Sequence, residues 1–471
     1  MLLIPRTQSE ADWRDAFADL ARRVARGEVP RHPLDLDADA RRLYVRRTLR
    51  EDHRFRIHNR PEGAQRKFDK LARSALDFFR GTALLFYRDM VGSDADLPQV
   101  FCIGDVHPEN FGVMPNVDGV PFFGVNDFDE AHVAPFSWDV KRGATGFYLY
   151  AKDNRFKKKH RQNVMQSFVQ GYLDALMEFA RDDREKHHQY RLDNSPPQIR
   201  ELLQGAVASR RKFLADKIDP AAGRFIATDE VVPCSSRVGQ FQRAVRAYVK
   251  KSDIDNRSGR AGHFKVKDVA VKKDSGTASL GLDRYWVLID GETDDHLDDI
   301  VLEVKQARRS ALSGLTPPPP EDSPVHDAGA TGEANPQGRA SQGARIALSH
   351  RVHLAGGDPY YGHATLDKQS FVVRERSPFK DSIDVEDLDV EAMCDYADTC
   401  GRVLAQAHAR ADEDSGLPGE DAERSILESV QPAVFVDDVG RFALAAVDRL
   451  ERDHALFCAD HALGAFNILR G

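Results

Sequence analysis

The chain has few cysteines and no long apolar run, and each absence excludes a class of protein. Five cysteines are scattered over 471 residues without a Cys-x-x-Cys pair, so the spacing suits neither a zinc site nor a disulfide framework. No segment approaches the ~18–20 continuous apolar residues that a membrane helix needs. The first residues, MLLIPRTQSE, contain too short an apolar stretch for a secretory signal. We therefore expect a protein of the reducing cytoplasm with soluble partners and no membrane contact.

Positive charge is not in excess either. The chain has 67 Lys and Arg against 75 Asp and Glu, a net charge of −8, so no overall positive field attracts nucleic acid, and no nucleic-acid partner is expected. The hydrophobic fraction of 41% and the charged fraction of 30% are typical of a globular chain. At ~100–200 residues per domain, the length predicts two or three packed units.

Hydrophobic periodicity predicts a mostly helical chain with two groups of strands. Helices are expected near residues 9–28, 64–91, 138–178, 198–218, 237–251, 344–355, 385–411 and 438–466. Strands are expected near residues 100–103, 120–125, 264–271, 285–289, 300–305 and 371–374. The first two strands are expected to form a hairpin-like pair. Residues 313–343, rich in proline, glycine and polar residues, are predicted to be a disordered insertion.

Two polar loops follow the first two predicted strands, GDVHPEN at residues 104–110 and NDFD at residues 126–129. Both could be simple turns, because Asp and Asn are common in tight turns. Magnesium, however, prefers carboxylate and amide oxygens. The candidate metal ligands are Asn110, Asp127 and Asp129. Asp105, five residues before Asn110, is the candidate general base, and His107 is a catalytic candidate that could orient it.

A third informative stretch is GTASLG at residues 276–281, followed by a lysine on the third strand of that region. Small residues in a hairpin allow backbone N–H groups to approach phosphates, and a strand lysine can reach the same oxygens. Taken alone, two glycines in a hairpin are weak evidence, because they more often only form the turn. The candidate nucleotide-binding residues are Gly276, Thr277, Ser279, Gly281 and Lys305.

The segment GDVHPEN…NDFDEAHVAPFSWD resembles the catalytic and metal loops of aminoglycoside-phosphotransferase-like kinases, whose pattern is HGDxHxxN followed by DFD and an Asp at the head of the next helix. This resemblance implies that Asp105 is the base, that Asn110 and Asp127 bind the metal, and that Asp139 braces the catalytic loop. Ile103 stands where that family has its first His, which weakens the bracing of the loop.

A second resemblance covers most of the chain. The runs FFRGTALLFYRD, CIGDVHPENFG, NDFDEAHVAPFSWDVKR, GTASLGLDRYWVLIDG, LEVKQARRSAL and LAQAHAR resemble the bacterial domain-of-unknown-function 2252 family. That family supplies no substrate, so the expected activity depends on the kinase-like motifs.

The kinase resemblance implies ATP and Mg²⁺ as cofactors and an α+β, two-lobed protein-kinase-like fold. Because the catalytic loop precedes the glycine-rich hairpin, the order must be circularly permuted. Residues 1–255 and 377–471 are expected to form a mostly helical large lobe, and residues 256–376 an antiparallel small lobe. Lys305 and Asp127 should then face one cleft.

Three points stay open from the sequence. Residues 344–355 contain no acid to pair with the strand lysine, and Leu348 stands where a kinase has Glu. Arg80 could contact a phosphate or simply close its helix against the last carbonyl groups. The acceptor is expected to be a small-molecule hydroxyl, with a protein acceptor as the other choice. A non-catalytic nucleotide-binding pseudokinase and a nucleotidyl (AMP) transferase are the alternative functions.

Overall fold

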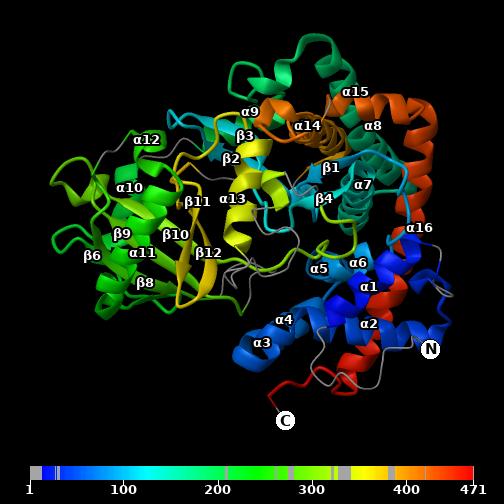
Figure 1. The fold of residues 1–471 in the computed structure, drawn as a ribbon, viewed down its shortest axis with the longest axis horizontal. Coiled ribbons are helices and arrows are strands. Elements are labelled where there is room, and N and C mark those ends of the chain that lie inside the picture. The colour runs from blue at the N-terminus through cyan, green and yellow to red at the C-terminus, as the bar shows by residue number, and fades with distance from the viewer. Residues whose placement is uncertain are drawn as a thin grey trace.

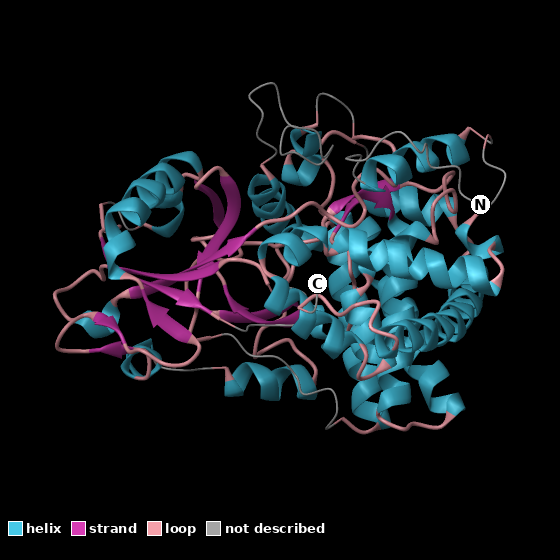
Figure 2. Ribbon diagram, turned by 90° about the horizontal axis from the view of Figure 1, so that it is seen from below, coloured by secondary structure: helices cyan, strands magenta, loops and turns pink. Residues whose placement is uncertain are grey.

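The computed structural model shows a helix-rich part and a sheet-rich part, seen side by side in Figures 1 and 2. It describes residues 13–26, 28, 32–206, 210–259, 262–273, 281–319, 323–326, 341–379, 388–419 and 421–469. Every strand pair among these residues is antiparallel. The chain is therefore of the α+β class. None of its described helices combines the length and the apolar character that crossing a bilayer requires.

The sheet-rich part is built on one six-stranded sheet with the strand order β11-β12-β10-β9-β8-β7. The strands are β7 (Val231–Pro233), β8 (Val266–Lys272), β9 (Arg284–Ile289), β10 (Ile300–Gln306), β11 (Gly362–Leu366) and β12 (Gln369–Glu375). β10 lies in the interior of the sheet and is buried along its whole length. Helix α11 (Val238–Lys251) packs on β8 and β11, and α13 (Gln342–His353) packs on β11 and β12. In Figure 1, α13 lies between this sheet and the helix-rich part.

The sheet-rich part begins earlier in the chain than the predicted boundary at residue 256. β7 pairs with β8, and α11 packs on the sheet, although both precede that boundary. Short elements accompany them: α10 (Arg210–Ala215), β5 (Ile218–Asp219), β6 (Arg224–Phe225) and α12 (Ile254–Ser258). The amphipathic pattern of α11 was visible in the sequence, but its apolar side chains, among them Phe241 and Tyr248, pack against the sheet and not against the helices.

The helix-rich part is centred on the crossing of α8 (Lys158–Asp182) with α14 (Val390–Ala409). Each helix has a glycine at the crossing: a Cβ atom at Gly171 would lie 2.4 Å from the backbone oxygen of Asp398, and one at Gly401 would lie 2.1 Å from that of Phe168. The two backbones are therefore in contact. Around this pair lie α7 (Phe136–Asp153), α9 (Pro197–Gly205), α15 (Ala422–Ser429) and α16 (Pro432–Ala462).

Six N-terminal helices complete the helix-rich part. They are α1 (Trp13–Ala25), α2 (Ala38–Asp52), α3 (Arg54–Asn59), α4 (Pro61–Leu71), α5 (Ala75–Gly81) and α6 (Ala83–Arg88). The helical run predicted at residues 64–91 is thus broken, because Ser74 caps α5 by accepting the N–H of Asp77 at 3.0 Å. Arg41 of α2 is buried and binds Asp89 at 2.6 Å and Asp453 of α16 at 2.5 Å. The two ends of the chain are therefore joined.

The predicted pairing of residues 100–103 with 120–125 is wrong. β1 (Gln99–Cys102) pairs with β4 (His132–Pro135), and β2 (Phe111–Pro115) pairs with β3 (Pro121–Val125). The segments that form β2 and β4 were not predicted as strands, since each is interrupted by Pro or Gly. The β2–β3 hairpin is therefore inserted between β1 and β4.

The structure describes only part of the insertion predicted at residues 313–343, because residues 320–322 and 327–340 lie outside the described ranges. The described residues are packed. Leu315 and Val325 are buried, and Thr316 donates its hydroxyl to the carbonyl group of Val133 at 2.8 Å. Single apolar side chains in a polar stretch therefore attach parts of this segment to the core.

Candidate functional site

The pairing of β1 with β4 places the loop after β1 beside the turn before β4. Gly104 has a φ angle of +70°, and a Cβ atom there would lie 2.4 Å from the backbone oxygen of Glu130. Only glycine allows this approach. The N–H of Asn126 donates to the carbonyl group of Asn110 at 2.9 Å. The two polar loops predicted from the sequence are therefore in direct contact.

Asp105 has a left-handed backbone conformation, with φ +50°. A non-glycine residue in such a region costs on the order of 1–3 kcal/mol and is often found at functional sites. Its N–H donates to the hydroxyl of Tyr87 at 2.8 Å, and Arg142 of α7 donates to its Oδ1 through Nε at 2.7 Å and also through Nη2. Within the described ranges, no donor contacts Oδ2. Oδ2 is thus the atom that can accept a proton.

The ionisation of Asp105 reflects its buried position. Burial raises the pKa of its carboxyl group from 3.8 to about 6, the charge of Arg142 opposes this rise, and the neighbouring carboxylates Glu130 and Asp127 add to it. A proton acceptor works best when its pKa lies near the operating pH. Asp105 is therefore ionised at neutral pH and is a stronger proton acceptor than an ordinary Asp.

Asn110 and Asp127 fit a magnesium site. Asn110 is buried at the end of η2 (Pro108–Asn110), and its Nδ2 donates to the carbonyl group of Asp105 at 2.7 Å. This bond fixes the amide and leaves Oδ1 as the acceptor. Asp127 is half-buried, and its Oδ1 accepts the N–H of Asp129 at 3.3 Å. An oriented amide oxygen and a carboxylate on adjoining loops are the donor set that Mg²⁺ prefers.

Lys305 of β10 reaches the same loops. It is 8% exposed and forms an ion pair with Asp129. Lys305 therefore lies close to the predicted metal loop, two residues from Asp127, although a long stretch of chain separates the two segments. The carboxylate partner of this lysine, which the sequence did not identify, is Asp129.

Helix α13 contributes an arginine to the site. The sequence analysis looked in this helix for a carboxylate that would pair with Lys305. Arg345 is fully buried and donates to the backbone oxygens of Asp129 at 2.8 Å and Ala131 at 2.5 Å. Leu348 belongs to a separate apolar cluster with Phe101 and Val352. The helix thus holds the metal loop through its backbone and does not pair with Lys305.

Arg80 and His107 lie near Glu109 and Tyr150. Arg80 forms an ion pair with Glu109, which also accepts the hydroxyl of Tyr150 at 2.6 Å. The imidazole of His107 is stacked near the ring of Tyr150, and its buried Nδ1 has no partner in the described part of the chain. Burial lowers the pKa of His107 well below its usual value. His107 is therefore neutral, and no described hydrogen bond joins its imidazole to Asp105 or Asn110.

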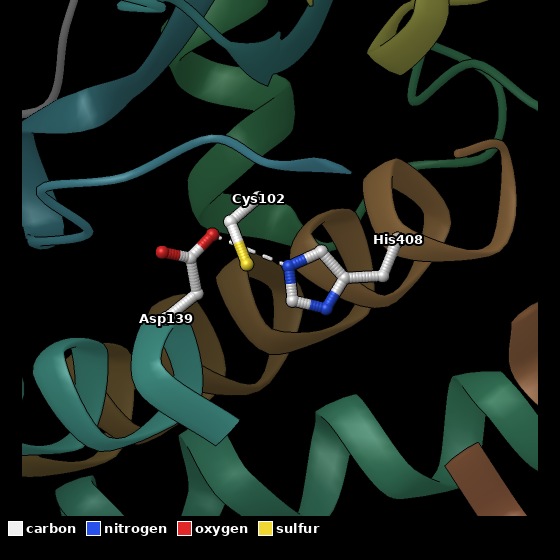
Figure 3. A group of neighbouring side chains, drawn as sticks. All are labelled: Cys102, Asp139 and His408. Carbon is white, nitrogen blue, oxygen red and sulfur yellow. Dashed lines mark hydrogen bonds and ion pairs between the residues drawn. The ribbon is translucent and has the colours of Figure 1, made fainter. Parts of the chain in front are cut away.

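Asp139 holds the start of the catalytic loop. Its carboxylate accepts the N–H of Ile103 at 2.9 Å and that of Gly104 at 3.2 Å. His408 of α14 contacts the same carboxylate at 3.2 Å through Nε2, and its Nδ1 lies 2.9 Å from the hydroxyl of Tyr172. Figure 3 shows Asp139 and His408 facing each other from α7 and α14. His408 therefore supports the carboxylate of Asp139 from α14.

Cys102 lies beside this pair, and the three side chains form a group with metal-ligand spacing (Figure 3). The group does not suit a metal. Burial raises the pKa of the Cys102 thiol well above its usual value, and the Sγ atom lies 3.5 Å from the carbonyl group of Ala134, to which it donates. The group is a structural brace.

Gly276, Thr277 and Ser279 of the predicted glycine-rich hairpin lie outside the described residues. Gly281 is described and has a φ angle of +78°. A Cβ atom at Gly63 of α4 would lie 2.7 Å from the Cα atom of Gly281. The base of the hairpin therefore touches the N-terminal helices, a contact that sequence reasoning missed.

A cavity of about 590 Å³ opens beside the end of β10. Its charged lining residues are Glu51, Asp52, Arg54, Arg56, Arg308 and Arg309. Arg308 binds Asp52 at 3.1 Å and Glu130 at 2.7 Å, and Glu51 is bound by Arg88 at 2.6 Å. Both acids of the lining are thus bound by arginines. Behind it, burial and repulsion from the arginines lower the pKa of Lys67 to about 7.

Sequence reasoning missed three arginines of the site, of which Arg142 and Arg345 are buried and Arg308 is half-buried. Arg142 and Arg308 lie within the runs NDFDEAHVAPFSWDVKR and LEVKQARRSAL, which carried the family resemblance, so a signal for them existed. Arg345 had no such signal, because the sequence alone does not distinguish an arginine on a buried helix face from one in solvent.

The fold and the site define an α+β protein in which a lysine of an antiparallel sheet is paired with one of two adjoining acidic loops. The chain belongs to the family described as "Uncharacterized protein conserved in bacteria (DUF2252)", which it matches over residues 59–460. This confirms the second resemblance. No curated protein and no solved structure matches the chain.

Proposed function

We propose that this protein is an ATP- and Mg²⁺-dependent phosphotransferase with a kinase-like fold in circularly permuted order. The observation that carries the proposal is the ion pair of Lys305 with Asp129, on the loop that also holds Asp127. In kinases a strand lysine and a carboxylate-bearing metal loop converge because both act on the same phosphates.

The permuted order is supported by the way the chain ends pack. The six-stranded sheet with α13 would be the small lobe, and the helices before and after it would form one large lobe. The bond of Arg41 to Asp453 joins α2 to α16 and so links the two halves of that large lobe. Neighbouring ends are what makes a permutation tolerable.

Asp105 would be the general base. Its Oδ2 would accept the proton of an acceptor hydroxyl while Arg142 holds Oδ1. The bracing of the loop by Asp139 keeps Asp105 in its strained position. A base of this kind contributes typically ~10²–10⁴-fold to the rate.

Asn110 and Asp127 would hold Mg²⁺, which when bound neutralises charge on the phosphates of ATP. Lys305 would exchange Asp129 for phosphate oxygens. Asp129 would then be available as a further metal ligand, which fits its place among the predicted ligands. The segment GTASLG would cover the phosphates with its backbone N–H groups.

The cavity beside β10 supports a small-molecule acceptor. Its volume of about 590 Å³ suits a small molecule, and the contact of Arg308 with Glu130 links its wall to the metal loop.

A second candidate, a nucleotide-binding pseudokinase, is favoured by the same ion pairs. Lys305 is held by Asp129 and Asp105 by Arg142, and α13 offers no carboxylate to draw the lysine away. Nucleotidyl transfer would use the same carboxylates with ATP bound in the opposite sense.

One experiment separates these functions. The full chain is incubated with Mg²⁺, a metabolite extract and ATP labelled in either the γ or the α phosphate, and binding of ATP is measured in parallel by calorimetry. Transfer of the γ label supports the proposal, and transfer of the α label supports nucleotidyl transfer. Binding without either transfer supports a pseudokinase, whereas absence of Mg²⁺-dependent ATP binding would refute all three.

A further inference from the structure

A second group of carboxylates lies in the helix-rich part, on elements that the proposed catalytic site does not use. η3 (Arg184–Lys186) follows α8, η8 (Glu413–Ser415) follows α14, and α15 begins at Ala422. The carboxylates near these elements form two triads, Asp183 with Glu185 and Glu423, and Asp412 with Asp421 and Glu423. In each triad, one oxygen of every carboxylate lies within 4.8 Å of the others. Glu423 belongs to both, so the five residues are one cluster.

The centre of this cluster is buried, and Arg410 acts on it only from the side of the backbone, where its Nη1 donates to the carbonyl groups of Glu185 and Lys186. Glu185 is 1% exposed, and Glu423 and Asp412 are each 2% exposed. In the part of the chain that the structure describes, none of these three forms an ion pair. Lys186 lies 3.6 Å from Asp183, and Arg424 lies 2.8 Å from Asp421, so both cations contact the more exposed members. Buried carboxylates that lack a counter-charge are strongly destabilising.

Helix capping explains part of the cluster. Asp412 accepts the N–H groups of Ala422 at 3.0 Å and Asp414 at 3.1 Å, which is an ordinary role for an Asp at a helix start. Capping does not explain Glu185. Its Oε2 is buried and no described residue donates to it, although its backbone is fixed by the amide of Gln406, which donates to its carbonyl group at 2.9 Å.

We propose that the cluster of Asp183, Glu185, Asp412, Asp421 and Glu423 binds a divalent cation of the calcium type. All five donors are carboxylates, which excludes the nitrogen and sulfur ligands typical of zinc. Calcium accepts six to eight oxygen ligands in irregular arrangements, whereas magnesium requires a near-ideal octahedron. Two triads that share one carboxylate fit the irregular coordination of calcium and not the octahedron of magnesium.

A bound cation would offset the mutual repulsion of the carboxylates in the cluster. It would also join the end of α8, the end of α14 and the start of α15. α14 carries His408, so the cation would stabilise the helix that braces the catalytic loop.

The test uses the full chain, freed of metal with a chelator and titrated with CaCl₂ by calorimetry in the absence of nucleotide. The wild type should bind Ca²⁺ and gain thermal stability on binding. Glu185→Gln and Glu423→Gln should each weaken binding at least about tenfold, because each removes a ligand charge. Glu428→Gln, an exposed residue of the same helix, is the matched control and should bind as the wild type does. Asp421→Asn, which is less buried, is a milder variant and should weaken binding in the same direction.

Two outcomes would overturn the proposal. One is no binding and no thermal shift up to about 10 mM Ca²⁺, above the ~10⁻³ M of the weakest protein sites. The other is unchanged affinity in Glu185→Gln, Glu423→Gln and Asp421→Asn. Asp127→Asn identifies the location: if it alone abolishes Ca²⁺ binding, the ion occupies the proposed catalytic site and the proposal fails. Retained binding in Asp127→Asn supports the cluster, whatever the fate of the phosphotransferase proposal.

Discussion

Lys305 and Asp129 form an ion pair across 176 residues of sequence, with their side chains 11% and 20% exposed. Glu303 shares the strand face of Lys305, since alternate strand residues point the same way. It is not the partner of this lysine, because Arg374 binds it at 2.8 Å and Arg284 at 3.2 Å. The pairing with Asp129 therefore joins the sheet to the loops of the helix-rich part.

The first prediction concerns this ion pair. In a double-mutant cycle, Lys305→Met and Asp129→Asn should show a stability coupling of about 0.5–3 kcal/mol, measured by urea unfolding, since contacting residues of one network are coupled to this extent. Lys305→Met should also reduce Mg²⁺-dependent ATP binding.

The control cycle for this prediction uses Lys272 and Glu230. They form an ion pair at the edge of the same sheet, but the Glu230 side chain is 64% exposed. Its coupling should stay below about 1 kcal/mol, the range of exposed pairs. Equal couplings in the two cycles would show that burial does not strengthen the Lys305 pair.

The second prediction separates the two aspartates of the site. Asp127→Asn should weaken Mg²⁺-dependent ATP binding, because a ligand charge that faces metal and phosphate is lost. Asp105→Asn should leave ATP affinity near that of the wild type and reduce turnover by ~10²–10⁴-fold, because only proton transfer is lost. Calorimetric titration of ATP with and without Mg²⁺, together with the phosphate-transfer assay, measures both. If Asp105→Asn abolishes binding and Asp127→Asn does not, the assigned roles are reversed.

The loops of this site could be located from the sequence because their chemistry is local. Asp105, Asn110 and Asp127 stand at fixed short spacings after apolar runs, and the structure brings the two loops into contact at Gly104. The α+β class was also predictable from periodicity. Lys305 could be proposed because it follows the glycine-rich hairpin on a strand.

The partners of these residues could not be predicted, because they depend on packing between distant segments. Asp129, the partner of Lys305, lies on a loop that Arg345 of the distant helix α13 holds through its backbone. The strand pairing was misjudged for a similar reason. β1 pairs with β4 across an inserted hairpin, and a sequence pattern indicates that a strand exists but not which strand lies beside it.

The third prediction follows from the pKa of Asp105, which burial raises to about 6. The base must be ionised to accept a proton, so kcat/KM should rise with pH through about 6 and then level off. Arg142 lowers this pKa. Arg142→Met should therefore shift the rising limb to higher pH, whereas Arg142→Lys, which keeps the charge, should shift it less. If the rising limb of kcat/KM stays at the wild-type pH in both variants, a group other than Asp105 causes it.

The same shift changes stability in a defined direction. Because the pKa is higher in the folded state than the usual 3.8, the folded chain holds a proton that the unfolded chain releases. This stabilisation is present at low pH and is lost as pH rises through about 6. The wild type should therefore lose stability relative to Asp105→Asn as the pH rises from 4 to 7. Urea unfolding of both proteins at the two pH values measures this difference in the free energy of unfolding.

The fourth prediction tests the contact between α8 and α14. Gly401→Ala should lower the free energy of unfolding by about 1–3 kcal/mol or more, the usual cost of overpacking, because the new methyl group would lie 2.1 Å from the backbone oxygen of Phe168. Gly239→Ala on α11 is the control. A Cβ atom there meets nothing within 4 Å, so this change should be neutral or stabilise by up to about 1 kcal/mol. Equal effects at the two positions would show that the helices do not cross at Gly401.

The fifth prediction concerns the brace of the catalytic loop. Asp139→Asn keeps the shape of the side chain but removes the charge that accepts the N–H groups of Ile103 and Gly104. It should lower the free energy of unfolding by about 1.5–3 kcal/mol, the range for hydrogen bonds to charged groups, and should reduce turnover because Asp105 follows the braced residues directly. Asp437→Asn on α16, an exposed position, should change stability by no more than about 0.5 kcal/mol. His408→Asn leaves the two backbone bonds of Asp139 in place, so it should cost less than Asp139→Asn in urea unfolding. If it costs more, the brace depends on His408 and not on the backbone bonds of Asp139.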